Sequence, residues 1–170
     1  MKRKVFVSLL LIVSIVFSFG SCKKEKGTRV EYCDLGIVLD EGFEAYDTDG
    51  AFHVAYSDGK TIVGISRFSF VDCEEYGLLT TFTPRKFADV YLEMLDRTVD
   101  ESVKVHGDVP YFTYTDTGSN GEMYFYMPTF YRTPYAYFII TFITPKTRET
   151  EGRVEFLEYT STVYILDKYL

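Results

Sequence analysis

Residues 122–144 read EMYFYMPTFYRTPYAYFIITFIT, a run rich in aromatic and β-branched residues. Such residues favour β-strands, and the corner Arg132-Thr133-Pro134 divides the run into two strands, Glu122–Phe130 and Tyr135–Thr144. In the second strand, large residues occupy odd and even positions alike, so both of its faces are apolar. A sheet that is apolar on both faces needs cover on both, or cover on one face and a partner on the other. This stretch therefore predicts a sheet packed between two further layers, or between one layer and a partner.

Two turn signals extend the sheet on either side of this run. Asn120-Gly121 precedes the strand Glu122–Phe130, and Ser57-Asp58-Gly59-Lys60 separates two earlier extended segments. Asn-Gly and Asp-Gly pairs tolerate the positive φ angles that tight hairpins require. They predict two hairpins, one formed by Val109–Thr115 with Glu122–Phe130 and one formed by Phe52–Tyr56 with Thr61–Phe70.

Two helices are predicted. The first begins at Thr83-Pro84, because threonine suits the N-cap and proline suits the first helical position. Its apolar residues recur at helical spacing and form one stripe: Phe87, Val90, Tyr91, Met94 and Leu95. The second helix runs from Glu149 to about Thr160, with a stripe formed by Val154, Leu157 and Ser161. Thr162–Ile165 follows as a short strand.

The order of these elements resembles that of the Mog/PsbP-like family over roughly residues 30–166. Leu39-Asp40-Glu41-Gly42-Phe43 is similar to the family's Leu-Pro-x-Gly-Phe corner, with Asp40 in place of the proline. Thr83 followed by Phe87-Ala88 is similar to its threonine-capped first helix, and a closing helix lies near Arg153–Tyr159. The resemblance implies a single α+β domain in which an antiparallel β-sheet is flanked by helices, as an α/β/α sandwich.

The same resemblance carries an expectation about function. The family is diverse and includes a Ran-binding import factor, a photosystem accessory subunit and many exported bacterial lipoproteins. Its known members act mostly by binding rather than by catalysis. The resemblance therefore implies a binding role, but no functional residue is carried over, because no site motif of the family matches this sequence.

Composition and charge exclude several classes of protein. Of the 170 residues, 46% are apolar and 18% are aromatic, which excludes disordered, coiled-coil and collagen-like chains. The net charge is −7, and from Cys33 onward 11 Lys and Arg stand against 23 Asp and Glu, a net of −12. This acidic balance argues against nucleic acid as a partner and against electrostatic binding to anionic lipid.

The amino terminus reads as an export signal. A basic start precedes the apolar run Val5–Phe19, whose 15 residues are fewer than the roughly 20 that a spanning helix needs. Phe19-Gly20-Ser21-Cys22 then resembles the lipobox of bacterial lipoproteins, in which the cysteine is lipidated, although Phe19 stands where Leu, Val or Ile is usual. A plain secretory signal with an unmodified Cys22 is the alternative.

The lipobox resemblance divides the chain into three parts. We expect residues 1–21 to be a lipoprotein signal peptide, residues 22–29 to be a polar tether that begins at the lipidated Cys22, and residues 30–170 to be the single domain. The domain would then be held at the extracytoplasmic face of a cell membrane through the lipid on Cys22.

Two cysteines remain in the domain, Cys33 and Cys73. In an exported protein they can form a disulfide, which would stabilise the fold by about 4 kcal/mol in the chain-entropy model. A domain of this size does not require that bond, and two small buried residues are the favoured interpretation. The chain contains no Cys-x-x-Cys, so neither a thioredoxin-like role nor a thiolate zinc site is indicated.

The best sequence candidate for an interaction surface is aromatic. Tyrosines and one arginine gather around the predicted corner of the 122–144 hairpin: Tyr124, Tyr126, Tyr131, Arg132, Tyr135 and Tyr137. Tyrosine and arginine are enriched at protein interfaces, because they combine a large contact area with a polar tip. Ordinary packing within the sheet explains the same residues and is the simpler interpretation.

No catalytic or metal-binding pattern is present in the sequence. The only histidines, His53 and His106, have no ligand spacing and no Gly-x-Ser-x-Gly nearby, and Asp47-Thr48-Asp49-Gly50 lacks the further ligands of a calcium loop. We therefore expect no enzyme activity and no cofactor. The expected function is that of a lipid-anchored, non-catalytic binding or accessory module with an envelope protein as partner. The alternative is a small-molecule carrier with a pocket lined by the aromatic sheet.

Overall fold

Two antiparallel sheets form the framework of the computed structural model, which describes residues 27–75, 77–95 and 102–166. The larger sheet has eight strands in the order β3-β4-β5-β10-β9-β7-β6, with β8 also paired to β9. Its strands are β3 (Glu44–Ala45), β4 (Val54–Ser57), β5 (Ile62–Ser69), β6 (Lys104–His106), β7 (Val109–Tyr111), β8 (Tyr114–Thr117), β9 (Met123–Arg132) and β10 (Ala136–Pro145). The smaller sheet has the order β1-β2-β11, and its strands are β1 (Thr28–Tyr32), β2 (Leu35–Leu39) and β11 (Tyr164–Ile165).

The hairpin of β9 and β10 is the centre of the molecule, as its sequence predicts. Strand β10 pairs with β9 on one side and with β5 on the other, and all but its last residue are buried. Its two faces belong to two different hydrophobic clusters, one containing Phe138, Ile140 and Phe142 and the other containing Tyr137 and Ile139. Of the two predicted arrangements, the structure shows the one in which the domain itself covers both faces.

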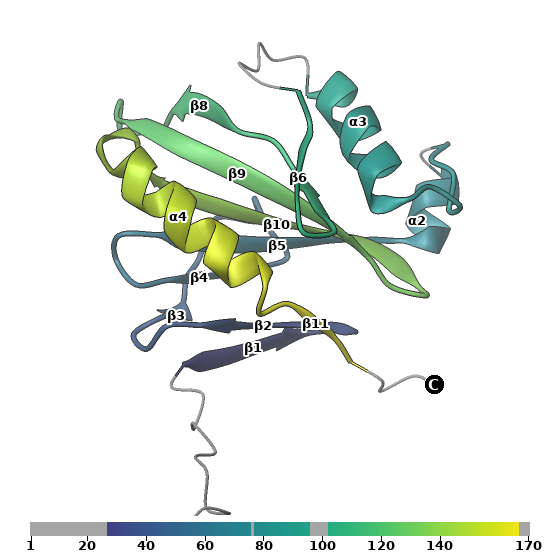
Figure 1. Cartoon of the computed structure of the whole chain (residues 1–170), viewed down its shortest axis with the longest axis horizontal. Helices are drawn as coiled ribbons and strands as arrows, with labels where there is room; N and C mark the ends of the chain where they lie inside the picture. The colour runs from purple at the N-terminus through teal and green to yellow at the C-terminus, as the bar shows by residue number, and fades with distance from the viewer. Residues whose placement is uncertain (1–26, 76, 96–101, 167–170) are drawn as a thin grey trace, which may run out of the picture.

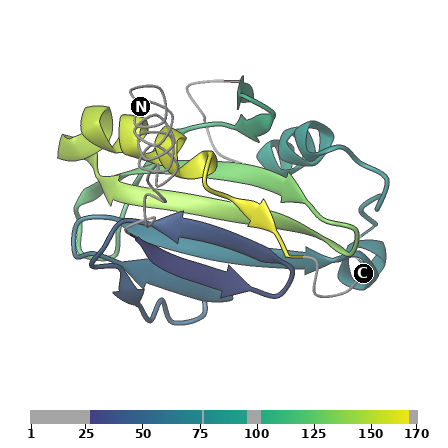
Figure 2. The ribbon, with the colours of Figure 1, turned by 60° about the horizontal axis from the view of Figure 1, so that its bottom comes forward.

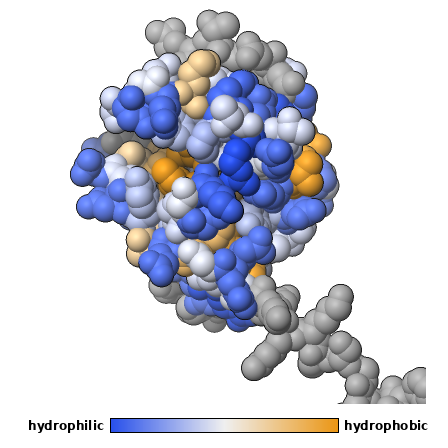
Figure 3. Space-filling view, turned by 90° about the vertical axis from the view of Figure 1, so that its left-hand side faces the viewer, coloured by the Kyte–Doolittle hydropathy of each residue, from blue (hydrophilic) through white to orange (hydrophobic). Residues whose placement is uncertain are grey.

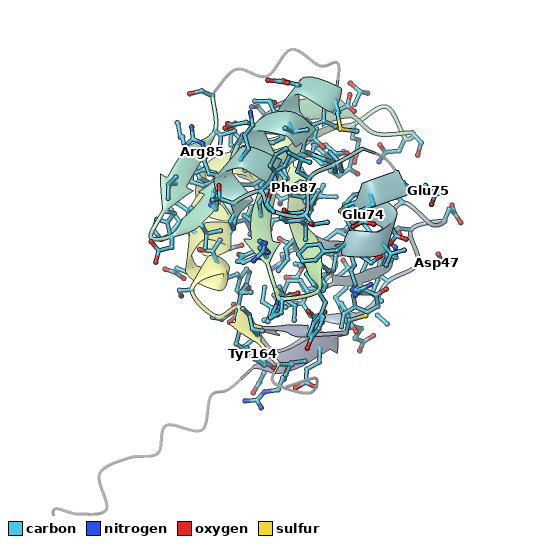
Figure 4. All side chains as sticks on the ribbon, turned by 90° about the vertical axis from the view of Figure 1, so that its right-hand side faces the viewer. Asp47, Glu74, Glu75, Arg85, Phe87 and Tyr164 are labelled. Carbon is cyan, nitrogen blue, oxygen red and sulfur yellow. The ribbon has the colours of Figure 1, made fainter. Side chains whose placement is uncertain are left out.

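Helices α2 (Phe70–Glu75) and α3 (Pro84–Met94) cover one face of the large sheet (Figure 1). The predicted N-cap of α3 is present, because the Lys86 N–H donates to the Thr83 hydroxyl at 3.2 Å. Phe87 is buried and stacks on Tyr137, with the ring centroids 4.4 Å apart. Figure 4 shows Phe87 beneath the helix, pointing into the molecule. Met94, which the sequence placed on the same stripe, is 63% exposed.

Helix α4 (Glu149–Thr160) and the small sheet cover the opposite face (Figures 1 and 2). The predicted bounds of α4 agree with the structure, but its predicted stripe is wrong, because Val154 is 58% exposed. The buried residues of the helix are instead Gly152, Phe156, Tyr159 and Thr160. Gly152 allows a close approach to the sheet, since a Cβ there would meet the Thr144 methyl group at 2.8 Å.

Other sequence predictions need smaller corrections. The predicted strand Val109–Thr115 is broken at Phe112-Thr113 into β7 and β8, which both pair with β9. The predicted strand Thr61–Phe70 ends at Ser69, where α2 begins.

The predicted fold class is confirmed. The described residues form a single α+β domain of antiparallel sheets flanked by helices. None of the described helices is both long enough and apolar enough to cross a membrane. The predicted signal peptide, Cys22 and most of the predicted tether lie outside the described residues.

Candidate binding groove

The tyrosines of the predicted interaction surface do not form one surface. Tyr124 and Tyr126 pair with Asp116 and Tyr114 of β8, near the start of β9. Tyr131 and Arg132 stand at the other end of the same strand, and Tyr135 follows in the turn. The hairpin corner therefore lies far from the first two tyrosines.

At the corner itself the remaining side chains diverge. Tyr131 packs against the cluster under α4, and its buried hydroxyl has no hydrogen-bond partner among the described residues. Burial raises the pKa of this hydroxyl far above its ordinary value. Arg132 lies over the Phe70 ring on the opposite face, 5.1 Å from its centroid, and donates to the Thr80 carbonyl. Tyr137 is fully buried. Packing within the domain therefore accounts for most of the residues of the predicted interaction surface.

The two cysteines of the domain are unpaired, so the disulfide that the sequence left open is not formed. Cys73 is buried in α2 within the cluster under α3. Cys33 is exposed at the turn between β1 and β2, where its φ angle is 53°. The two residues belong to layers on opposite faces of the large sheet, which is why they do not meet.

The other polar residues singled out in the sequence lie at the surface. His53 and His106 are both exposed. Asp47 accepts a hydrogen bond from the Asp49 N–H at 3.0 Å, as in an ordinary aspartate turn. Asp47 is labelled in Figure 4 on the outside of the molecule. Among the described residues, no three His, Cys, Asp or Glu side chains are grouped to hold a metal ion.

A groove of about 730 Å³ lies between the small sheet and the C-terminal end of α4. We call it the α4 groove. Its walls come from β1, β2, α4 and the segment that leads into β11: Arg29, Val38, Leu39, Asp40, Glu155, Glu158, Tyr159, Ser161, Thr162, Val163 and Tyr164. No residue of β9 or β10 lines it, because the aromatic side chains of those strands fill the two hydrophobic clusters.

Hydrogen bonds hold the walls of the α4 groove together. The Tyr159 hydroxyl donates to Asp40 Oδ2 at 2.9 Å, and the Thr162 hydroxyl donates to the Val38 carbonyl at 2.7 Å. The Val38 N–H in turn donates to the Thr162 hydroxyl at 3.2 Å. Thr162 therefore extends the pairing of β11 with β2 through a side chain. Burial, followed by the bond to Asp40, raises the pKa of Tyr159.

One end of the α4 groove depends on a glycine. The Tyr164 ring lies across β2 at Gly36, where a Cβ would overlap the ring. The Arg29 guanidinium also lies over this ring, 5.6 Å from its centroid. Tyr164 is labelled in Figure 4 on the short strand at the edge of the small sheet. This stacking places one cation and one aromatic ring at the mouth of the groove.

The charge of the α4 groove is predominantly negative. Asp40, Glu155 and Glu158 line it against the single cation Arg29. Glu155 also accepts a hydrogen bond from Arg148 at 3.2 Å. The groove thus offers carboxylates, hydroxyls and apolar surface, which suit binding of a ligand with positive charge and hydrogen-bond donors.

Sequence reasoning missed the α4 groove because its walls lie far apart in the chain. Val38 and Thr162 are separated by 124 positions. No local sequence pattern predicts a contact between two residues so far apart. The only signal in the sequence was the short strand predicted at Thr162–Ile165, without a partner.

Comparisons with known proteins give a fold but no family. No protein-family model matches the chain, and no curated protein matches its sequence. A crystal structure of a protein from Bacteroides thetaiotaomicron is similar with a TM-score of 0.57 and 13% identity, over 84% of this chain and 50% of that one. The chain thus spans half the length of that protein. At this identity, the likeness supports the fold alone.

The solution structure of cyanobacterial PsbP (CyanoP) from Synechocystis is also similar, with a TM-score of 0.45 and 10% identity. That match covers 87% of this chain and 99% of the other. Its TM-score is below 0.5, so no argument about fold or function is based on it.

Proposed function

We propose that the chain is a lipoprotein that is anchored through Cys22 on the extracytoplasmic face of a cell membrane and acts as a non-catalytic binding module. The observation that supports a binding role is the α4 groove, which is large enough for a ligand and is lined by convergent polar groups. Its excess of carboxylates favours a short, positively charged segment of an envelope protein as the occupant.

A photo-crosslinking experiment in cells tests the groove. The photoreactive amino acid benzoyl-phenylalanine replaces either Ser161, which is exposed in the groove, or Ser119, which is exposed in the turn between β8 and β9. We expect a defined adduct with an envelope protein from position 161, none from position 119, and loss of the adduct when Glu158→Lys reverses one charge. Equal adducts at both positions, or an adduct indifferent to Glu158→Lys, would refute the proposal.

The anchor is tested separately by metabolic labelling with a palmitate analogue. The wild-type chain should be labelled and should sediment with membranes, whereas Cys22→Ser should be neither labelled nor membrane-bound. Cys33→Ser is the matched control, because Cys33 is the exposed thiol of the domain, and it should label like the wild type. Equal labelling of the wild type and Cys22→Ser would contradict lipidation.

The volume of the α4 groove also favours a second candidate function, that of a small-molecule carrier. The aromatic residues that line the groove are Tyr159 and Tyr164 rather than those of the central sheet. A carrier would show a rise in melting temperature with its ligand. The Tyr159→Phe and Glu158→Lys variants would reduce that rise, and a partner protein would not be needed.

A further inference from the structure

A second cavity, of about 480 Å³, lies at the opposite end of the small sheet from the α4 groove. The described residues that line it are Cys33 and Asp34 in the turn between β1 and β2, Arg67 on β5, and Tyr135 beside the start of β10. We call it the turn pocket. It shares no wall residue with the α4 groove, so its occupant is a separate question from the proposed function.

The turn pocket is built around a buried pair of opposite charges. The Asp34 side chain is 3% exposed, and its Oδ1 atom lies 3.7 Å from Arg67 Nε, too far for a hydrogen bond. Neither Asp34 Oδ2 nor Arg67 Nε has a hydrogen-bond partner among the described residues. A buried carboxylate oxygen and a buried guanidinium N–H that have no hydrogen-bond partner do not recover the hydration that they lost.

The surrounding structure holds these two residues in place. The Asp34 carbonyl accepts a hydrogen bond from the Leu166 N–H at 2.9 Å, and the Arg67 N–H donates to His53 Nδ1 at 3.3 Å. The Arg67 guanidinium lies over the Phe138 ring, 6.0 Å from its centroid. The backbone of both residues is therefore fixed, while the Arg67 side chain rests against the Phe138 ring.

Local backbone strain adds to this arrangement. Cys33 is the first of the two residues between β1 and β2, and its φ angle of 53° is one that glycine ordinarily supplies in such turns. Positive φ at a residue other than glycine costs free energy and recurs at ligand sites. Here the positive φ angle of Cys33 makes a sharp turn in the chain, and the turn places Asp34 in the wall of the turn pocket.

We propose that the turn pocket binds a small zwitterion with an ammonium group beside a carboxylate, of which the free α-amino acids are the simplest members. The ammonium would donate to Asp34, and the carboxylate would accept from Arg67. An organic anion would leave Asp34 without a donor, and an organic cation would leave Arg67 without an acceptor. Of these three kinds of ligand, only one that carries both charges supplies partners for both Asp34 and Arg67.

Entry of the ligand requires a movement of Arg67. The unpaired atoms of Asp34 and Arg67 are covered, whereas 26% of the Arg67 side chain is exposed. Arg67 is thus the member of the pair that can swing outward. Nearby, Asp72 is engaged by the Ser69 hydroxyl at 2.6 Å, and this bond, as its main cause, lowers the pKa of Asp72. Asp72 does not line the pocket.

Melting scans of the detergent-solubilised full chain test the proposal, with each of the twenty standard amino acids as a probe. We expect at least one of them, at about a hundred times its dissociation constant, to raise the melting temperature by several degrees. The amide and the N-acetyl derivative of that amino acid each lack one charge and should raise it far less. Asp34→Asn and Arg67→Gln should weaken binding by about tenfold or more.

Two further variants keep the test decisive. Tyr135→Ala removes an exposed wall of the turn pocket without touching the buried pair, so it should fold and still weaken binding, even if Asp34→Asn does not fold. Asp40→Asn alters the α4 groove and should leave binding unchanged. The proposal fails if no amino acid raises the melting temperature, or if Tyr135→Ala and Arg67→Gln bind as tightly as the wild type.

Discussion

Tyr159 shows how much one side chain contributes to the candidate groove. Its ring is 8% exposed and packs edge-on against Phe43, while its hydroxyl reaches Asp40 across 119 positions of sequence. The residue therefore joins α4 to the corner that follows β2. The corner quoted for the family resemblance is thus part of the wall of the candidate groove, through Asp40, as well as a turn.

Replacing Tyr159 by Phe should lower stability by about 1 kcal/mol at neutral pH, because the bond to Asp40 is lost while the ring is kept. Burial raises the pKa of Tyr159, so the native state holds its proton more tightly than the unfolded chain does. The stability from this shift is present below about pH 10 and is lost as the pH rises above that value.

Urea unfolding at pH 7 and pH 10.5 measures this difference. The wild type should lose more stability between the two values than Tyr159→Phe does, because the variant lacks that ionisable group. Tyr46→Phe is the matched control, since Tyr46 is 48% exposed and its side chain is not held in the groove. An equal alkaline loss in the wild type and Tyr159→Phe would show that the hydroxyl does not contribute as described.

At the scale of single elements, α3 offers a direct comparison of two positions on one predicted stripe. Phe87 is 2% exposed and contacts the rings of Tyr137 and Phe130, whereas Met94 is 63% exposed. Phe87→Ala should destabilise the fold by about 3–5 kcal/mol, and Met94→Ala by less than about 0.5 kcal/mol. Urea unfolding monitored by circular dichroism gives both values. Similar losses from the two substitutions would contradict the orientation of α3.

Local signals explain which elements could be predicted from the sequence. The cap at Thr83, the hairpin turns at Asp58-Gly59 and Asn120-Gly121, and the bounds of α4 all depend on neighbouring residues. The buried face of α4 could not be predicted from neighbouring residues, because the large apolar residues of this helix point to opposite sides. Val154 is exposed and Phe156 is buried, two positions apart, so helical spacing alone could not choose between the two faces.

The two cavities were beyond local prediction for a related reason. The turn pocket joins Asp34 to Arg67 across two sheets, and the α4 groove joins β2 to residues near the end of the chain. Tertiary packing alone brings these residues together. The surface predicted around Arg132 failed as a single patch because residues along one strand alternate between faces, and because Tyr124 and Arg132 lie at opposite ends of β9.

At the scale of the whole molecule, the arrangement of charge separates the domain from its predicted anchor. The chain from Cys33 onward has a net charge of −12, and lysines are concentrated before it. Figure 3 shows one face on which hydrophilic residues dominate and apolar ones appear only in small separate spots. An acidic body of this kind is repelled by an anionic membrane surface, so a lipid on Cys22 would hold the domain near the bilayer without drawing it onto the lipid.

The two hydrophobic clusters share the strands β9 and β10, and this sharing predicts that they unfold together. Phe87 anchors the cluster under α3, and Phe156 anchors the cluster under α4. Phe87→Leu and Phe156→Leu should each destabilise the protein by about 1–2 kcal/mol while leaving one cooperative transition. The substituted rings lie on opposite faces of the sheet without contact, so the two losses should add to within about 0.5 kcal/mol in the double variant.

Circular dichroism and tyrosine fluorescence provide independent probes of this unfolding, since the chain has no tryptophan and 15 tyrosines. Coincident urea transitions with an unchanged slope are expected for the wild type and all three variants. If Phe156→Leu moved only part of the signal to lower urea, the layer formed by α4 and the small sheet would be a separate folding unit. Unfolding on one face of the sheet would then not be coupled to unfolding on the other, and the α4 groove could open while the cluster under α3 stays folded. Shared strands argue against that outcome, because every residue of β10 that packs under α4 is flanked by one that packs on the opposite face.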